Sequence, residues 1–357
     1  MFFSADAGGG GYHIWRQSFP DGKPEQLTPT GASEEEGLAM MPDGKSLITS
    51  VGTQQSVIWI HDEQGERPLT NEGYAFFPSL SPDGKTVYYL QKGGTSRSFT
   101  SGELWKVDVA TGRQEAVLPG LTLGHFSLSP DGQKVVFAVA GEDKNAGIWI
   151  ALLDRTQAPR QLTSGGEFRA FFGTGGDILY QSTTNPPQVM RVKQDGSNVR
   201  RVTEEETLHL MSVSPDGRWV IAGIGAEGGH GDRNTVVKAY SVEGGVPVVL
   251  CDTCVVGFGP SSRSYAAPVS WSQDGKWMYY SLRHFFQGSK KTLAVPIAPG
   301  TPPSPLLRGV TTEAEALRLR GIRVLAEESV TPGATPDTYV FTRKLVTSNL
   351  YRLYFEP

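Results

Sequence analysis

The side chains best suited to catalysis or metal binding are sparse in this chain of 357 residues. Its six histidines are scattered, at His13, His61, His125, His209, His230 and His284. His230 and Asp232 share a glycine-rich stretch and could offer two metal ligands, but a protein zinc site uses three or four. We therefore predict neither a metal nor a cofactor.

The two cysteines, Cys251 and Cys254, have the Cys-x-x-Cys spacing of redox and zinc-binding pairs. A redox pair needs the N-terminus of a helix, and the flanking residues are typical of a strand and a turn. A zinc site would need further ligands at matching spacing. We predict a local disulfide in an oxidising compartment, contributing about 2 kcal/mol, or two buried thiols in a reducing one.

Motifs of the large catalytic families are missing. There is no Gly-x-Ser-x-Gly elbow, and no alternation of strands with long helices as in an α/β-hydrolase. A phosphate-binding loop with its lysine, a His-Arg-Asp loop and an Asp-Phe-Gly motif are also absent from the sequence. The prediction is that this chain is not itself an enzyme.

One turn motif recurs along the chain, in its clearest form as Ser81-Pro82-Asp83-Gly84 before the strand-like run Thr86–Tyr89. Pro presets φ for the turn, Asp bonds the backbone two residues on, and Gly adopts the left-handed conformation. Related copies are Met41-Pro42-Asp43-Gly44, Ser129-Pro130-Asp131-Gly132, Thr174-Gly175-Gly176, Ser214-Pro215-Asp216-Gly217 and Ser272-Gln273-Asp274-Gly275. Each copy predicts a hairpin.

The spacing of the copies indicates a repeat. Successive turns lie 40, 48, 44, 41 and 58 residues apart, and Trp15, Trp59, Trp105 and Trp149 follow the same rhythm. Four short strands in each period of about 40–45 residues are typical of a β-propeller blade. We predict an all-β propeller of about seven four-stranded blades, with six or eight as alternatives.

The predicted single domain spans residues 1–357. Its blades are 1–31 (partial), 32–73, 74–120, 121–166, 167–206, 207–254, 255–307 and 308–357 (partial). A capping box at Thr312 and Glu315 predicts one short helix near residues 312–319. Met1–Ala5 has the pattern of a strand and not of a signal peptide. Either the chain is a piece of something longer, or a C-terminal strand completes the first blade.

Polar or aromatic residues stand just before the first strand of several repeats. In a propeller these positions surround one end of the central axis, a common place for a ligand. The residues are Glu35, Tyr74, His125, Arg169 and His209. We predict that they form a ligand-binding surface at the channel mouth.

The bulk composition excludes two classes of partner. Thirty-three basic and 37 acidic residues leave a formal net charge of −4, which gives no basic footprint for nucleic acid. The sequence contains no run of 18 apolar residues, so no membrane insertion is predicted. We expect a monomer that binds a protein or a small molecule whose identity the sequence does not reveal.

The repeated Ser-Pro-Asp-Gly-Lys, Ile-Trp and Leu-Thr elements resemble the TolB-type, WD-repeat-like propeller repeat over nearly the whole chain. Three segments resemble more closely the C-terminal propeller of bacterial receptor-type serine/threonine protein kinases. They are His13–Gly22, Val57–Asp62 with Gly65–Arg67, and Pro336–Phe341 with Asn349–Arg352.

That resemblance implies a non-catalytic sensor or scaffold portion of a bacterial signalling protein, outside the membrane when it is attached to a membrane segment. This sequence lacks the kinase motifs and a membrane segment, so the compartment stays open. The alternative is the propeller domain of a peptidase, or a propeller enzyme acting at the channel mouth.

Overall fold

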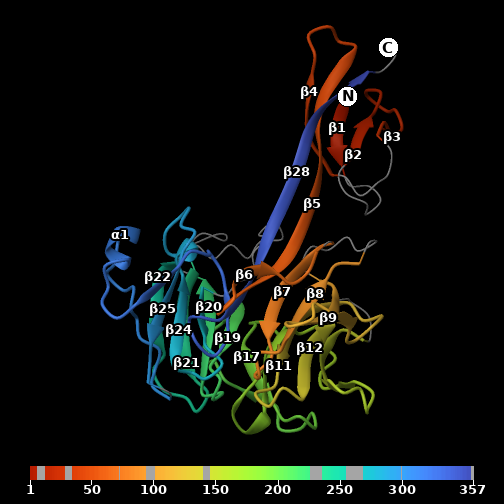
Figure 1. The fold of residues 1–357 in the computed structure, drawn as a ribbon. Helices are drawn as coiled ribbons and strands as arrows, with labels where there is room; N and C mark the ends of the chain where they lie inside the picture. The colour runs from red at the N-terminus through yellow and green to blue at the C-terminus, as the bar shows by residue number, and fades with distance from the viewer. Residues whose placement is uncertain are drawn as a thin grey trace.

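The computed structural model describes residues 1–5, 13–28, 34–71, 73–93, 101–139, 145–225, 235–254, 268–298 and 300–354. These residues form seven antiparallel sheets. Figure 1 shows a body of strands from which a long arm rises, with a small sheet beside the upper part of the arm.

Five sheets of the body each consist of four consecutive strands. The first contains β7 (Ala75–Leu80), β8 (Thr86–Gln91), β9 (Glu103–Asp108) and β10 (Gln114–Ala116). The second contains β11 (Leu123–Leu128), β12 (Lys134–Val139), β13 (Gly147–Leu152) and β14 (Arg160–Gln161). The third contains β15 (Phe168–Phe172), β16 (Ile178–Gln181), β17 (Val189–Val192) and β18 (Arg200–Arg201).

The fourth sheet contains β19 (His209–Val213), β20 (Trp219–Gly225), β21 (Thr235–Ser241) and β22 (Val248–Cys254). The fifth contains β23 (Val269–Trp271), β24 (Trp277–Ser281), β25 (Thr292–Pro296) and β26 (Arg323–Leu325). Between β25 and β26 lies α1 (Glu313–Ala316), capped by the predicted box of Thr312 and Glu315. Two short 3-10 turns are η1 (Thr174–Gly176) and η2 (Leu282–His284).

A sixth sheet joins the two ends of the chain. Its strands are β4 (Glu34–Met40), β5 (Ser46–Asp62), β6 (Gly65–Pro68), β27 (Thr331–Pro332) and β28 (Tyr339–Tyr354). Within the body, β27, the first half of β28, the second half of β5 and β6 make a four-stranded blade. The other halves of β5 and β28 pair with each other and, with β4, form the arm.

The six blades close into a ring because each buries an apolar face against both neighbours. Six hydrophobic clusters lie at the six junctions. At the closing junctions, Tyr339 and Phe341 of β28 pack against Tyr279 of β24, and Val340 joins Val87 of β8. The predicted all-β propeller is confirmed, and its ring has six blades, a number that the sequence analysis kept as an alternative.

The recurring turn closes the first hairpin of five of the six blades, whereas the copy at Met41–Gly44 joins β4 to β5 in the arm and residues 333–338 join β27 to β28. In the first copy, the Ser81 hydroxyl donates to the Asp83 carboxylate at 2.6 Å and accepts from the Thr86 N–H at 2.9 Å. Gly84 has φ +71°, in the left-handed region that favours glycine. Thus the local turn chemistry fixes where these hairpins end.

The structure divides the stretch that the sequence analysis assigned to one blade at residues 32–73. Its first half lies in the arm, and its second half lies in the ring. The reason is that β5 continues straight through residues 51–56, where β28 satisfies its backbone by pairing along the whole strand from Ser46 to His61. The predicted partial blade 308–357 therefore completes the ring with β5 and β6.

The predicted partial blade 1–31 lies outside the ring. It forms the small sheet of β1 (Phe2–Ala5), β2 (His13–Arg16) and β3 (Glu25–Gln26), which packs against β4 of the arm. No helix in the part of the chain that the structure describes is long and apolar enough to cross a membrane.

Candidate functional site

The innermost strands of the ring all begin at the same face, which we call the mouth face. They are β7, β11, β15, β19, β23 and β27. Because β28 runs antiparallel to β27, it ends at this face, and the arm leaves the ring there. The predicted residues Tyr74, His125, Arg169 and His209 stand at or near the starts of their inner strands, as the repeat spacing requires.

Three of the predicted residues come together, from three successive blades. Arg169 on β15 donates a hydrogen bond to the carbonyl oxygen of Leu210 on β19, the residue after His209, at 3.0 Å. On its other side, the N–H of Ala170 donates to Nδ1 of His125 on β11 at 3.4 Å. Arg169 thus lies between the two histidines, and we call these three residues the axial cluster.

An irregularity in the inner strands positions the axial cluster. The register of β15 with β16 shifts between Phe168 and Ala170, and Arg169, the residue between them, has φ +58°. Bulges of this kind re-aim side chains and are frequent beside active sites. Left-handed backbone costs a non-glycine residue about 1–2 kcal/mol, so the contacts of Arg169 must offset that strain.

Burial and charge determine the protonation of the axial cluster. Arg169 is 6% exposed and, as a guanidinium, stays charged. Both histidines keep partial exposure, yet desolvation, followed by the charge of Arg169, lowers the pKa of His125 to about 3 and that of His209 to about 4. Both imidazoles are therefore neutral near pH 7.

The hydrogen bond of His125 assigns its tautomer. Because Nδ1 accepts from Ala170, the single proton of the neutral ring is assigned to Nε2, which is then a donor. The ring of His125 also packs against that of Phe171, with 4.7 Å between centroids. The axial cluster therefore combines one fixed cation with a neutral, oriented imidazole donor.

Tyr74 lies at the mouth face on the blade before His125, at the base of the arm. It forms a parallel bridge with Ser56 of β5, whose hydroxyl donates to the carbonyl of Ala75 at 2.7 Å. The ammonium of Lys92 lies 5.9 Å from the centre of the Tyr74 ring. Tyr74 is thus held by its own blade and by the arm.

Glu35 does not lie on an inner strand of the ring, as the sequence analysis expected. It belongs to β4 and pairs with Val51 in the arm, because the predicted blade 32–73 is divided there. The side chain of Glu35 lies outside the described residues, as do His230 and Asp232. Cys251 on β22 is disulfide-bonded, and the side chain of Cys254 is not among those described.

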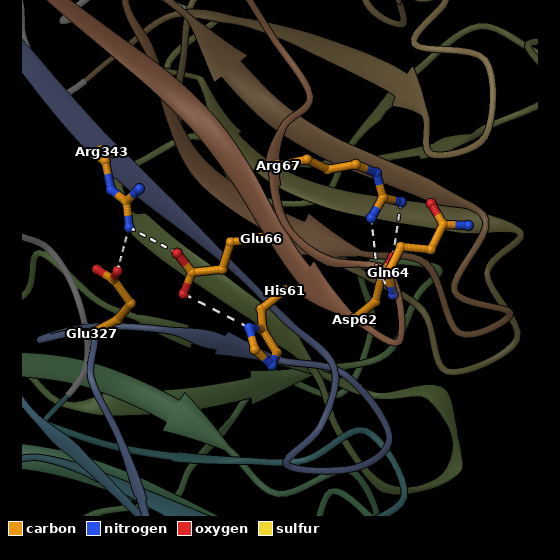
Figure 2. Close-up of polar contacts among 7 residues, drawn as sticks. All are labelled: His61, Asp62, Gln64, Glu66, Arg67, Glu327 and Arg343. Atoms are coloured by element: carbon orange, nitrogen blue, oxygen red, sulfur yellow. Dashed lines mark hydrogen bonds and ion pairs between the residues drawn. The ribbon is translucent and has the colours of Figure 1, made fainter.

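A second polar cluster, which the sequence analysis did not identify, joins the two ends of the chain (Figure 2). Arg343 of β28 pairs with Glu327 at 2.6 Å and with Glu66 of β6 at 3.2 Å. Its guanidinium lies 4.3 Å from the centre of the Trp59 ring. His61 lies 3.7 Å from the other oxygen of Glu66.

We call Arg343, Glu327, Glu66 and His61 the closure cluster. Its residues come from β28, from the crossing between blades, and from β6 and β5, so it forms only when the chain ends meet. Beside it, the Arg67 guanidinium donates two hydrogen bonds, of 2.6 and 2.8 Å, to the Asp62 carboxylate. No local motif marks these residues in the sequence, because their partners are set by ring closure.

Two surface pockets lie away from the axial cluster. One, of about 370 Å³, lies between the segment that follows β10 and the end of β13 with its turn, and it is lined by Leu118, Leu152 and Arg155 among others. The second, of about 140 Å³, is lined by Cys251, Phe285 and Arg308 among others. Neither contains a residue that the sequence analysis proposed for ligand binding.

Comparisons with known proteins agree on the fold. No family model matches the chain. The structure of a putative TolB from Agrobacterium tumefaciens covers 82% of this chain and 99% of its own, with a TM-score of 0.52 and 15% identity. TolB from Acinetobacter baumannii covers 83% of this chain and 75% of its own, with a TM-score of 0.50 and 15% identity. The chain has a TolB-like propeller fold.

A curated relative is an enzyme. It is dipeptidyl-peptidase 5 from Porphyromonas gingivalis, 23% identical over 221 residues. The match covers 56% of this chain but 32% of the relative, so the chain spans about a third of that protein. The prediction that this chain is not an enzyme was therefore wrong, because the chain matches part of a dipeptidyl-peptidase although its own sequence lacks the hydrolase motifs.

Proposed function

We propose that this propeller binds a ligand with an exposed carboxylate at its mouth face, through Arg169 between His125 and His209. The observation that carries the proposal is the meeting of these three residues from three successive blades. Their strands are rigid and packed, so the cluster is formed before a ligand arrives. Sites built on such elements hold their geometry well.

The chemistry of the cluster favours an anion. A guanidinium matches a carboxylate in charge and in planar geometry. The two histidines are neutral near pH 7, so Arg169 supplies the positive charge of the cluster, and the Nε2 proton of His125 is suited to a carboxylate oxygen. Low local dielectric strengthens each of these interactions.

A peptide is the ligand class that best fits the comparisons. One curated relative is a dipeptidyl-peptidase, and this chain spans about a third of it. We propose that the propeller holds a peptide, by its C-terminal carboxylate, for a catalytic module outside residues 1–357. The axial cluster would act as the binding half of such a protein.

A sensor role in a kinase-linked signalling protein is the second candidate. It is favoured by the three segments that resemble the receptor-kinase propellers, which lie in β2, in β5 with β6, and in β28. Both candidates require a ligand at the mouth face. They differ in the module that the propeller serves, so a co-purified peptidase or kinase would separate them.

Calorimetric titration with short peptides tests the proposed binding. We expect peptides with a free C-terminal carboxylate to bind and their C-terminal amides to bind more weakly. Arg169→Gln should weaken binding by about 10- to 100-fold, since a hydrogen bond to a charged group contributes about 1.5–3 kcal/mol. Arg200→Gln is the matched control, because Arg200 lies exposed on the outermost strand of the same blade.

Equal binding of the acid and amide peptides would contradict the proposal. So would an Arg169→Gln protein that is folded and binds like the parent. Thermal unfolding of each variant shows whether it is folded. Arg169→Lys is a second test, because it keeps the charge but loses the planar guanidinium. We expect its peptide affinity to lie between those of the parent and Arg169→Gln.

A further inference from the structure

The outer half of β28, residues 344–354, is an edge strand of the arm. One of its edges pairs with β5 from Ser56 to Ser46. Along the other edge, the described residues supply only β27, which pairs with Tyr339 and Val340 inside the ring. Figure 1 shows this half of β28 rising clear of the body.

This edge strand carries large apolar side chains in solvent. Leu350 is 78% exposed, Tyr354 73%, Tyr351 48% and Leu345 45%. A long, apolar, open edge is a template for pairing with another strand, and proteins normally shorten it, charge it or cover it. Residues 344–354 are long and largely apolar, carry only two charges, and the described residues supply no strand that pairs with this edge.

The charges of the segment do not oppose pairing. Its two cations are Lys344 and Arg352. Arg352 is already neutralised within the arm, because it binds the Asp43 carboxylate at 2.6 Å and the Ser46 hydroxyl at 2.9 Å. Its guanidinium also lies 4.8 Å from the centre of the Tyr354 ring.

We propose that a second copy of this chain pairs with the edge, antiparallel to itself, through residues 344–354 centred on Asn349. In that register Leu345 lies opposite Leu353, and Lys344 lies opposite Tyr354. Arg352 lies opposite the apolar residue Val346. The segment is thus self-complementary, as a two-fold symmetric interface requires.

Other features of the segment agree with that register. The two copies of Leu350 become diagonal neighbours, about 7–8 Å apart, within reach of each other. Shifting the centre to Ser348 would place Lys344 opposite Arg352 and separate the leucines, and like charges directly opposite are destabilising. The pairing would extend the three-stranded arm into a six-stranded sheet across two copies.

The mass of the full chain in solution tests the proposal. By size-exclusion chromatography with light scattering, we expect a dimer at micromolar concentrations, although the sequence analysis predicted a monomer. Leu350→Lys places a charge beside the two-fold axis and should give a monomer. Val246→Lys is the control, because Val246 is 92% exposed in the turn between β21 and β22, and it should remain a dimer.

Cysteine cross-linking tests the register. Asn349→Cys faces its own copy across the two-fold axis and should form a disulfide-linked dimer under mild oxidation, while Leu345→Cys should not. A mixture of Leu345→Cys and Leu353→Cys chains should cross-link.

A monomeric parent chain would overturn the proposal. A dimer that survives Leu350→Lys and is not trapped by Asn349→Cys would overturn it as well, because it would use another surface. Far-UV circular dichroism confirms that Leu350→Lys is folded, which is expected for a change at so exposed a side chain.

Discussion

At the scale of single residues, the axial cluster shows how a strained position can be used. Arg169 is buried, charged and in left-handed backbone, three features that each cost free energy. They are offset by the neighbouring blades, whose groups bond to Arg169 and its successor Ala170. A residue with such costs and no role in turn formation is a functional candidate.

The two histidines of the axial cluster make stability depend on pH. Their pKa values, about 3 for His125 and about 4 for His209, lie below the ordinary value of 6.5. Between those values the unfolded chain binds more protons than the folded one. The contribution of the two histidines to stability is therefore fully present above pH 6.5, and it is lost as the pH falls towards their folded-state pKa values.

His125→Gln should flatten this dependence. The change removes at most about 1.4 kcal/mol per pH unit from the slope below pH 6.5, and less where partial exposure weakens the effect. Urea unfolding at about pH 7.5, 6 and 5 measures the slope. Equal slopes for parent and variant below pH 6.5 would show that His125 titrates normally, and the range above pH 7 provides the internal control.

At the scale of elements, the hairpins were predictable because their determinants are local. Ser and Asp of the motif take part in each of these hydrogen bonds, and their partners lie within five residues, so the motif can be recognised without its surroundings. The short helix was predictable for the same reason, from Thr312 and Glu315. The bulge at Arg169 was not, because it depends on pairing with β16 and on the neighbouring blade.

Ser81→Ala tests the turn motif. The Ser81 hydroxyl is the main cause of the lowered pKa of Asp83, followed by the N–H of Lys85. Without it, the Thr86 N–H loses an acceptor in a partly buried position, and we expect the free energy of unfolding to fall by about 1–2 kcal/mol. Ser164→Ala, at an exposed serine, should change it by less than about 0.5 kcal/mol.

The loss of stability in Ser81→Ala should also depend on pH in the acid range. A carboxyl whose folded-state pKa is lowered contributes stability that is present above its ordinary value of 3.8 and is lost as the pH falls below it. The deficit of Ser81→Ala should therefore shrink below about pH 4. A deficit that stays constant down to about pH 3 would mean that the hydroxyl does not act through Asp83.

At the scale of the whole molecule, the sequence predicts the blades but not how the ring closes. The spacing of the turns identifies each repeat, whereas the partner of the last strand is chosen by packing between chain ends. Tyr339, Val340 and Phe341 fill two inter-blade junctions, and Arg343 of β28 binds Glu66 of β6 where the two ends of the chain meet. The axial cluster followed from repeat spacing alone, whereas Glu35, predicted for the same surface, lies in the arm because its blade is split by the straight course of β5.

Because the contacts that close the ring all lie within the six blades, we predict that the ring folds without the arm. A chain of residues 53–345 keeps all six hydrophobic junctions and the closure cluster, so we expect cooperative unfolding and carboxylate binding close to those of the full chain. A chain of residues 1–337 lacks β28, so Tyr279 and Val87 lose their partners at two junctions. It should lose cooperative unfolding, because burying those side chains contributes about 1.5–3 kcal/mol each.

Circular dichroism melts and the peptide titration measure both truncated chains. The shorter ring should also be monomeric, since it lacks residues 346–354 that the proposed dimer needs. If residues 53–345 failed to fold while 1–337 unfolded cooperatively, the arm and not β28 would be closing the propeller. If both chains unfolded like the parent, the two ends of the chain would not be joined through β28. The order of strands in the closing blade would then have to be different.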